Sequence, residues 1–344
     1  MDSDGQRVTE ALSMEDAQSG GGSMRAIVQD AYGSADVLRL ASIPKPEPKA
    51  NEVLIRVHAA GMDRGTWHLT TGKPYLLRLV FGLRKPKNPV PGLDVSGTVV
   101  AVGSAVTRFR PGDEVFGFGR GSYAQYTVAR EDKLALKPGN LSFEQAAVVP
   151  VSASTALQGL RAGGITAGQK VLILGASGGV GSYAVQLAKA SGLEVTGVCS
   201  TSKMDLVRAL GADHVIDYTR EDFADGTRKY DVILDLAGNP TLARLRRALT
   251  PSGTAVVAGG EEGGPWTGGI GRQFRALALS LVIRQRLTML AVREGSEDLE
   301  YLSGLLDAGT LTPAIDRTYP LHQVPDAMRY FDAGNARGKI AVTL

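Results

Sequence analysis

A glycine-rich segment near the middle of the chain restricts the possible folds more than any other feature. It reads Gly175-Ala-Ser-Gly-Gly-Val-Gly181, follows the apolar run 170–174 and precedes helical spacing of apolar residues over 180–190. Between a strand and a helix, such glycines let the backbone turn tightly and approach a pyrophosphate, whose charge is met by N–H groups at the helix N-terminus. We therefore predict a dinucleotide site with loop contacts from Gly175, Ser177, Gly178, Gly179, Val180 and Gly181.

Strands and helical patterns alternate after about residue 141. Apolar runs over 170–174, 194–199, 214–217, 230–235 and 254–258 are separated by helical patterns over 180–190, 203–210 and 241–249. Strands that are apolar almost throughout are buried on both faces, as in a parallel sheet with helices on each side. This part of the chain predicts a doubly wound, parallel-sheet Rossmann domain.

The preceding segment, from Met24 to about Leu136, has a different rhythm. Short alternating or β-branched runs are separated by Gly and Pro, a pattern typical of a compact all-β module. The chain has 344 residues, and a typical domain has roughly 150, so we expect about two domains. The overall class is α/β.

The residues after the second strand of the Rossmann domain bear on the choice of dinucleotide. An NAD-selective site usually has an Asp or Glu there for the ribose hydroxyls, whereas this chain has Ser-Thr-Ser-Lys. Hydroxyls and a lysine suit a 2′-phosphate, so we predict NADPH, with contacts from Ser200, Thr201 and Lys203. Alternatively the hydroxyls cap a helix and Lys203 is a solvated first-turn residue; both can hold together. Tyr218, after the third strand, either lies against the adenine or covers the sheet edge.

Several further motifs occur in the order of a known family. They are Ala59-Ala-Gly61, Pro91-Gly-Leu-Asp94-Val-Ser-Gly97, Val99-Val-Ala-Val-Gly103, Pro111-Gly-Asp-Glu-Val-Phe-Gly117, Ala146-Ala-Val-Val-Pro150, Thr155-Ala-Leu157, Leu210-Gly-Ala-Asp213-His-Val-Ile-Asp217 and Gly338-Lys339-Ile340. With the glycine loop, they make residues 24–344 resemble the medium-chain dehydrogenase/reductase superfamily. Within it, the chain is most similar to the zinc-independent, quinone oxidoreductase-like branch, which includes relatives of a reticulon-4-interacting mitochondrial protein.

The resemblance implies a domain plan. A GroES-like β-barrel catalytic domain would span 24–145, a Rossmann NADP-binding domain 146–286, and residues 287–344 would return to complete the catalytic domain. NADPH would lie in the cleft between the domains, and a homodimer is common in the family. The resemblance further implies cofactor contacts from Thr155, Gly259, Ala336 and Arg337, although Arg337 is alternatively a charge at a helix C-terminus.

Zinc alcohol dehydrogenases of the same superfamily are the nearest competitor, and the residues disfavour them. Their three catalytic zinc ligands would fall at Asp63, Leu93 and Val151, and their Ser/Thr proton relay at Gly65. Leu and Val cannot coordinate a cation, and one carboxylate does not hold zinc. The only cysteine, Cys199, ends the second Rossmann strand outside these positions, so we predict no metal site.

Without a Lewis acid, an electron-poor acceptor is easier to reduce than a simple ketone. We therefore expect hydride transfer to a quinone or an α,β-unsaturated carbonyl, with Asp63, Thr66, His68 and Tyr75 as catalytic candidates by resemblance. Asp63 is alternatively a capping or turn residue, and His68 an exposed loop histidine. An alternative from a different functional class is a catalytically silent NADPH-binding protein with a regulatory or interaction role. A zinc alcohol dehydrogenase is the third and disfavoured hypothesis.

The distribution of charged residues along the chain indicates which partners the protein binds, and its N-terminal segment indicates where the protein is located. The chain carries 38 Lys and Arg against 35 Asp and Glu, and residues 1–23 hold five of the acids but one base. We expect an anionic small ligand and no nucleic acid. Residues 1–23 predict a disordered extension, or a leader upstream of the true start, without a secretory or transit pattern, so we expect a cytoplasmic protein.

A basic stretch over 272–286 contains four arginines around the apolar run 276–283, which is too short to span a membrane. We interpret the stretch as a lid or a dimer element, hinged by the glycines of 263–271. The alternative is an amphipathic surface helix for membrane or partner contact.

Overall fold

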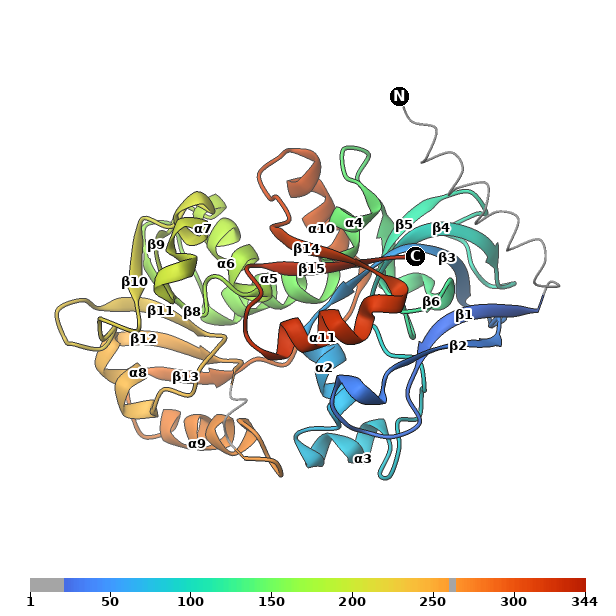
Figure 1. Cartoon of the computed structure of the whole chain (residues 1–344). Helices are drawn as coiled ribbons and strands as arrows, with labels where there is room; N and C mark the ends of the chain where they lie inside the picture. Colours follow the sequence, from blue (N-terminus) through green and yellow to red (C-terminus); the bar gives the residue numbers. More distant parts are fainter. Residues whose placement is uncertain (1–21, 260–263) are drawn as a thin grey trace.

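The computed structural model describes residues 22–259 and 264–344 and contains a β-rich domain beside a parallel sheet with helices (Figure 1). The extension predicted over 1–23, apart from its last two residues, lies outside the described residues, as does the first glycine of the expected 263–271 hinge.

The parallel sheet has six strands in the order β10-β9-β8-β11-β12-β13, and every neighbouring pair is parallel. The chain order reverses between β8 and β11, and open α/β sheets bind ligands at the carboxyl ends of the strands at such a point. The strands are β8 (Lys170–Leu174), β9 (Glu194–Cys199), β10 (His214–Asp217), β11 (Tyr230–Asp235), β12 (Leu249–Val257) and β13 (Arg286–Met289). The helices of this part are α5 (Pro150–Gly163), α6 (Gly179–Ala190), α7 (Met204–Ala209), α8 (Leu242–Ala248) and α9 (Ile270–Ser280).

Burial explains the apolar strands of this sheet. The β8 and β11 side chains are buried almost throughout, and successive residues pack into two apolar clusters, one on each face. The sheet therefore has the doubly wound architecture. The predicted boundary at residue 286 falls on the first residue of β13, which pairs with β12 inside the sheet.

The β-rich domain is built on a seven-stranded sheet. Its order is β14-β15-β3-β4-β5-β7, with β6 paired to β3, while β1 and β2 form a separate pair. The last strand, β15, runs antiparallel to β3, with Ile340 opposite Met62, so the end of the chain lies in this domain. The strands are β1 (Ser23–Val28), β2 (Arg39–Pro44), β3 (Glu52–Met62), β4 (Asp94–Val102), β5 (Glu114–Phe118), β6 (Tyr126–Arg130), β7 (Leu134–Leu136), β14 (Ile315–Pro320) and β15 (Lys339–Thr343).

Two helices correct the expectation of an all-β module over 24–136. Helix α2 (Arg64–Thr71) follows β3 directly, and the single turn α3 (Arg78–Phe81) comes after a short 3-10 turn at Tyr75–Leu77. Asp63 starts α2 because its carboxylate accepts a hydrogen bond from the Thr66 N–H at 2.8 Å. The remaining helices are α4 (Phe143–Ala147), α10 (Ser296–Asp307) and α11 (Val324–Asp332).

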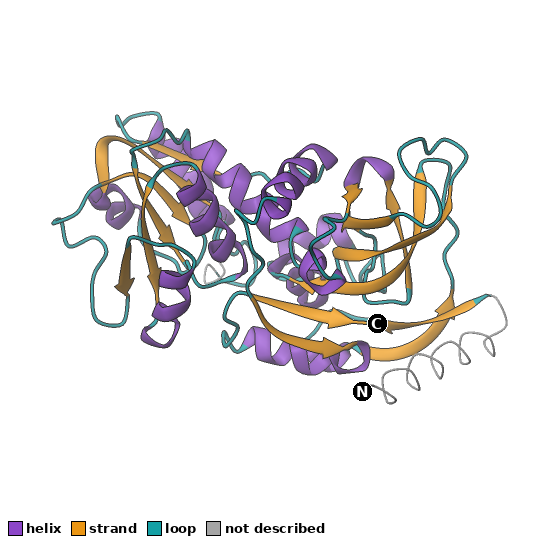
Figure 2. Cartoon of the chain, turned by 90° about the horizontal axis from the view of Figure 1, so that it is seen from above, coloured by secondary structure: helices purple, strands orange, loops and turns teal. Residues whose placement is uncertain are grey.

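Helices lie between the parallel sheet and the β-rich domain (Figure 2). The N-terminus of α5 touches β4, because the Val151 N–H donates to Asp94 Oδ1 at 2.7 Å. No helix within the described residues is long and apolar enough to cross a membrane.

Candidate active site

The glycine loop has a geometry that only glycine tolerates at two positions. Gly175 has a φ of +81°, and a Cβ there would lie 2.5 Å from the Ala237 Cβ. A Cβ on Gly181 would lie 2.1 Å from the Gly175 carbonyl oxygen. No side chain caps α6 at Gly178, so the first-turn N–H groups are available to an anion. These features fit the pyrophosphate of a dinucleotide.

A groove of about 700 Å³ runs along this loop. Ten of the predicted cofactor contacts line it: Gly175, Ser177, Gly178, Gly179, Val180, Gly181, Ser200, Lys203, Tyr218 and Ala336. Thr155 and Gly259 line an adjoining cavity instead. The fold thus gathers residues from the Rossmann domain and from the returning C-terminal segment around one groove.

Two predicted contacts are engaged elsewhere. The Thr201 hydroxyl donates to Asp217 Oδ2. The Arg337 guanidinium pairs with Asp205 at 2.6 Å, and its backbone N–H donates to Asp316. Neither Thr201 nor Arg337 lines the groove.

Lys203 holds the C-terminal segment against the groove. Its Nζ donates to the carbonyl oxygens of Gly334 and Ala336, each at 2.8 Å. Partial burial lowers the pKa of Lys203. An ammonium group has three N–H donors, so one remains for a phosphate.

The sequence reasoning missed Arg244, which lines the groove together with Lys203 and Arg64. It pairs with Asp222 at 2.7 Å and lies over the Phe223 ring. It belongs to the predicted helix over 241–249, but no motif distinguishes it from its neighbours Arg246 and Arg247.

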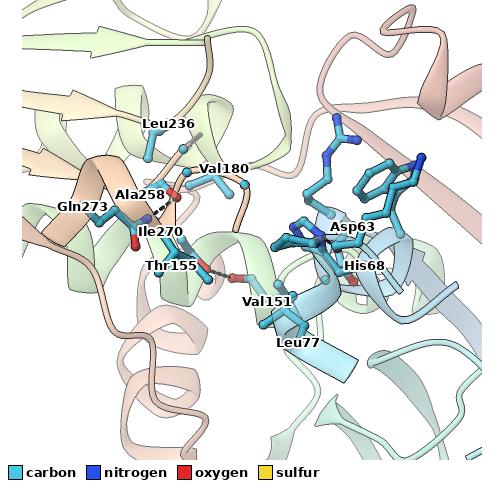
Figure 3. A pocket seen from close by; sticks show the side chains of 18 of the residues that line it. Asp63, His68, Leu77, Val151, Thr155, Val180, Leu236, Ala258, Ile270 and Gln273 are labelled. Atoms are coloured by element: carbon cyan, nitrogen blue, oxygen red, sulfur yellow. Dashed lines mark hydrogen bonds between the residues drawn. The ribbon is translucent and has the colours of Figure 1, made fainter. Parts of the chain in front are cut away.

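A cavity of about 800 Å³ adjoins the groove in the cleft between the domains. Asp63, His68 and Leu77 come from one side, and Thr155, Ile270 and Gln273 come from the other (Figure 3). Groove and cavity share Asp63, Arg64, Ser152, Val180 and Leu236. A molecule in the groove and one in the cavity would meet at these shared residues.

Asp63 lies at this junction, but both of its oxygens are bound by Thr66. The Thr66 N–H donates to Oδ1 at 2.8 Å and the Thr66 hydroxyl to Oδ2 at 3.2 Å. Thr66 itself is fully buried and does not line the cavity. The alternative reading of Asp63 as a capping residue therefore has direct support, and a carboxylate can still accept from a ligand.

His68 lines the cavity as a hydrogen-bond acceptor. Its Nδ1 lies 2.5 Å from the Lys73 carbonyl oxygen, which can only accept, so Nδ1 carries the proton. Burial lowers the pKa of His68 below 6.5, so the ring is neutral at pH 7. Nε2 is then unprotonated, and we infer that His68 is unsuited to donate a proton.

Tyr75 does not line the cavity. It contacts the segment 265–266 of the other domain. Its N–H donates to the Pro265 carbonyl at 2.7 Å, the Leu76 N–H donates to the Trp266 carbonyl at 3.0 Å, and the Tyr75 and Trp266 rings meet edge to face. Because Pro265 also lines the cavity, this pairing joins the two domains at its edge.

A buried cluster behind the junction went unnoticed in the sequence. Lys339 Nζ lies 3.3 Å from Asp94 Oδ2 and 2.9 Å from Ser152 Oγ, and all three side chains are buried. Burial raises the pKa of Asp94, and Lys339 opposes the rise. Because the Lys339 ammonium can only donate, the Ser152 oxygen accepts and its own proton is free to point elsewhere.

Arg272 shows how the basic stretch 272–286 is attached. It is buried against Asp235, with Nη1 2.6 Å from Oδ2, and also donates to the Gly259 and Pro240 carbonyls. Burial raises the pKa of Asp235 to about 7 despite this partner. The first turn of α9, with Ile270 and Gln273, thereby forms a wall of the cavity.

The fold and this two-part cleft define an oxidoreductase that uses a nicotinamide cofactor. Residues 210–342 match the family described as zinc-binding dehydrogenase, and residues 49–139 the alcohol dehydrogenase GroES-like domain. The 2-methylene-furan-3-one reductase of Solanum lycopersicum is 36% identical over 334 residues, and the chloroplastic NADPH-dependent alkenal/one oxidoreductase of Arabidopsis thaliana is 35% identical. Each alignment covers 93% of this chain and 79% of the relative. The solved quinone oxidoreductase from Coxiella burnetii is 30% identical, with a TM-score of 0.83 over 94% of this chain and 99% of that one.

The chain belongs to the medium-chain dehydrogenase/reductase superfamily, in its zinc-independent, quinone oxidoreductase-like branch. The word zinc in the family description does not describe the donors here: Leu93 and Val151 offer none, and Asp63 caps a helix. Residues 22–259 and 264–344 contain no group of three or more His, Cys, Asp or Glu able to hold a metal ion. Burial raises the pKa of the Cys199 thiol to about 11, which disfavours the thiolate that metals bind.

Proposed function

We propose that this protein reduces quinones or α,β-unsaturated carbonyl compounds with NADPH and without zinc. The observation that carries the proposal is the continuity of the glycine-loop groove with a cavity that shares Ser152 and Val180 with it. The names of three relatives support this acceptor class. The tomato relative is named for a furanone, the Arabidopsis relative for alkenals and alkenones, and the Coxiella relative for quinones.

When bound, NADPH supplies a hydride; the protein's residues position the partners and hold the proton. Residues of the glycine loop would hold the pyrophosphate, and Lys203 and Ser200 the 2′-phosphate. Ser152 is the side chain we propose as hydrogen-bond donor to the acceptor oxygen, because Lys339 donates to one of its lone pairs and leaves the hydroxyl proton free. Apolar groups such as Leu77 and Ile270 would exclude water from the cavity.

The test follows NADPH absorbance with 9,10-phenanthrenequinone, 1,4-benzoquinone and a set of enones, using protein freed of metal by chelation. We expect oxidation above the blank. NADPH binding without oxidation of any acceptor would instead favour the silent NADPH-binding protein. Stoichiometric zinc, found by elemental analysis of the purified protein before chelation, would favour the alcohol dehydrogenase instead. Ser152→Ala should lower kcat at unchanged NADPH affinity, with Ser191→Ala as a matched control outside both cavities.

The preference for NADPH over NADH is tested at Lys203. Because Lys203 also binds the Gly334 and Ala336 carbonyls, Lys203→Ala will weaken both cofactors to some extent. The ratio of the two dissociation constants separates the effects: NADPH should lose far more affinity than NADH. Equal losses would leave Lys203 with only the structural role.

We further propose a homodimer joined at the free edge of β13. This strand ends the six-stranded order, and the exposed Leu281 and Val282 precede it closely. Sedimentation equilibrium should give twice the chain mass, and Leu281→Asp with Val282→Asp should give the monomer. A cytoplasmic location stays a prediction, since some relatives are named as chloroplastic or mitochondrial.

A further inference from the structure

Exposed apolar side chains gather beside the cavity. Of the fourteen large apolar side chains exposed among the described residues, six lie within 76–83 and 266–274. Leu79, Leu83 and Trp266 are 65%, 68% and 72% exposed, and exposed apolar side chains that lie together mark binding sites for proteins or membranes. We call this set the rim; its members are Leu76, Leu79, Val80, Leu83, Trp266 and Phe274.

The rim is one surface although its two segments belong to different domains. The backbone bonds from Tyr75 to Pro265 and from Leu76 to Trp266, at 2.7 and 3.0 Å, join the segments directly. Figure 1 shows α3, which contains Leu79 and Val80, and α9, which contains Phe274, along the same lower edge of the molecule.

The same segments form a wall of the cavity on their inner side. Pro74 and Leu77 line it from the first segment, and Pro265 and Ile270 line it from the second. The rim therefore borders the compartment in which we place the acceptor.

Within the two described segments that form the rim, all formal charges are positive. Neither 64–93 nor 264–293 contains an Asp or Glu, and Lys73, Arg84, Lys85, Lys87 and Arg275 are exposed there.

Acids on adjoining elements are engaged with other partners. Asp30 precedes Tyr32, whose hydroxyl donates to the Gly82 carbonyl, and it pairs with Arg39 at 2.8 Å. Glu294 pairs with Lys133. The acids at 261 and 262 lie outside the described residues.

We propose that the rim is a docking surface for an anionic lipid membrane. Apolar side chains flanked by Lys and Arg bind where acyl chains meet negatively charged headgroups. A second copy fits this surface poorly, because a two-fold interface would bring the same basic surface of each copy face to face. Docking here would place the cavity next to the bilayer, where apolar quinones and enones dissolve. The proposal goes beyond the reductase function, and vesicle binding tests it without turnover.

The test is co-sedimentation of the full chain with vesicles of phosphatidylcholine alone or with about 30% phosphatidylglycerol. We expect binding to the anionic vesicles, weakened by 0.5 M NaCl. Replacing Arg84, Lys85 and Lys87 together by Gln should weaken it about tenfold or more, from the contribution of each base near such a surface. The charge-matched control replaces Lys49, Lys170 and Arg228, all exposed elsewhere, and should bind as the unmodified protein does.

The contribution of the apolar rim side chains is tested by the double variant Leu79→Ser with Leu83→Ser, which should also reduce vesicle binding. The control is Leu136→Ser, at a 58% exposed site on β7, which should bind as the unmodified protein does. Activity with a water-soluble quinone should stay unchanged in all variants. No binding to either vesicle, or equal binding by rim and control variants, would overturn the proposal. A shift from dimer to monomer in the rim variants would assign the rim to contact between copies, which also overturns it.

Discussion

Substitutions at two glycines of the loop before α6 should have different effects, one on cofactor binding and the other on folding stability. At Gly178, whose φ of −84° and ψ of 178° any residue adopts, an added Cβ would have one neighbour within 4 Å, the Gly175 carbonyl at 3.4 Å. At Gly181, the Cβ would lie 2.1 Å from the same carbonyl oxygen and 2.7 Å from Ala176 Cα. Gly178→Ala should therefore fold normally and alter only the groove, whereas Gly181→Ala should strain the backbone.

The expected magnitudes follow from these distances. Real Cβ contacts essentially never fall below 3.0 Å, so Gly181→Ala must move backbone atoms by about 1 Å, at a cost of roughly 1–3 kcal/mol for overpacking. For a chain of this size, that corresponds to a fall in Tm of about 1–4 °C. Gly178→Ala should leave Tm unchanged or raise it slightly, because alanine lowers the entropy of the unfolded chain by about 0.4–1 kcal/mol.

Thermal unfolding with and without NADPH measures both effects. NADPH at 100 times its dissociation constant should stabilise the unmodified protein by about 2.7 kcal/mol. Gly178→Ala should lose most of that stabilisation while keeping its own Tm, because the methyl group occupies the space that the pyrophosphate needs. If Gly178→Ala bound NADPH as tightly as the unmodified protein, close approach of a ligand to this backbone would be refuted.

Three further predictions concern Asp63, Arg272 and His68. Asp63→Ala should lower the free energy of unfolding in urea by about 1 kcal/mol through loss of the α2 cap, while Asp63→Asn keeps it; equal losses would contradict the capping role. Arg272→Met should cost about 3–5 kcal/mol by leaving Asp235 buried and unpaired, and adding Asp235→Leu should restore most of it; a loss below about 1 kcal/mol would mean that water reaches the pair. Burial lowers the pKa of His68 below its unfolded value of 6.5, so its contribution to stability is full above pH 6.5 and falls below it. His68→Gln should therefore flatten the fall in Tm between about pH 6.5 and 5, as should His58→Gln, since burial lowers the pKa of His58 too; an unchanged slope would refute this assignment.

The Rossmann half could be predicted because its signals are local. Continuous apolar runs identified the strands, and the loop from Gly175 to Gly181 fixed the start of α6. The helices α2 and α3 were not predicted because they span only eight and four residues. Their one clear signal is Asp63, and an Asp at such a position fits a helix cap and a turn equally well.

The acceptor side depends on contacts that no local pattern encodes. Lys339 and Asp94 are 245 residues apart, and Lys339 and Ser152 are 187 residues apart. In the sequence, Gly338-Lys339 is recognisable only as one of the motifs shared with the family. Its role becomes clear in the fold. The pairing of β15 with β3 buries the Lys339 ammonium group, which there needs a carboxylate from one domain and a hydroxyl from the other.

This arrangement makes the junction of groove and cavity sensitive to how the domains meet. Asp94 binds both Lys339 and the Val151 N–H at the start of α5, so moving α5 relative to β4 would disturb the partner of Lys339 and the orientation of Ser152 together. The Tyr75 and Trp266 contact and the backbone bonds beside it also join the two domains, next to Pro265 of the cavity lining. Acceptor specificity should therefore respond to substitutions at either contact, even where the altered side chain does not line the cavity, because each sets the separation of the two walls.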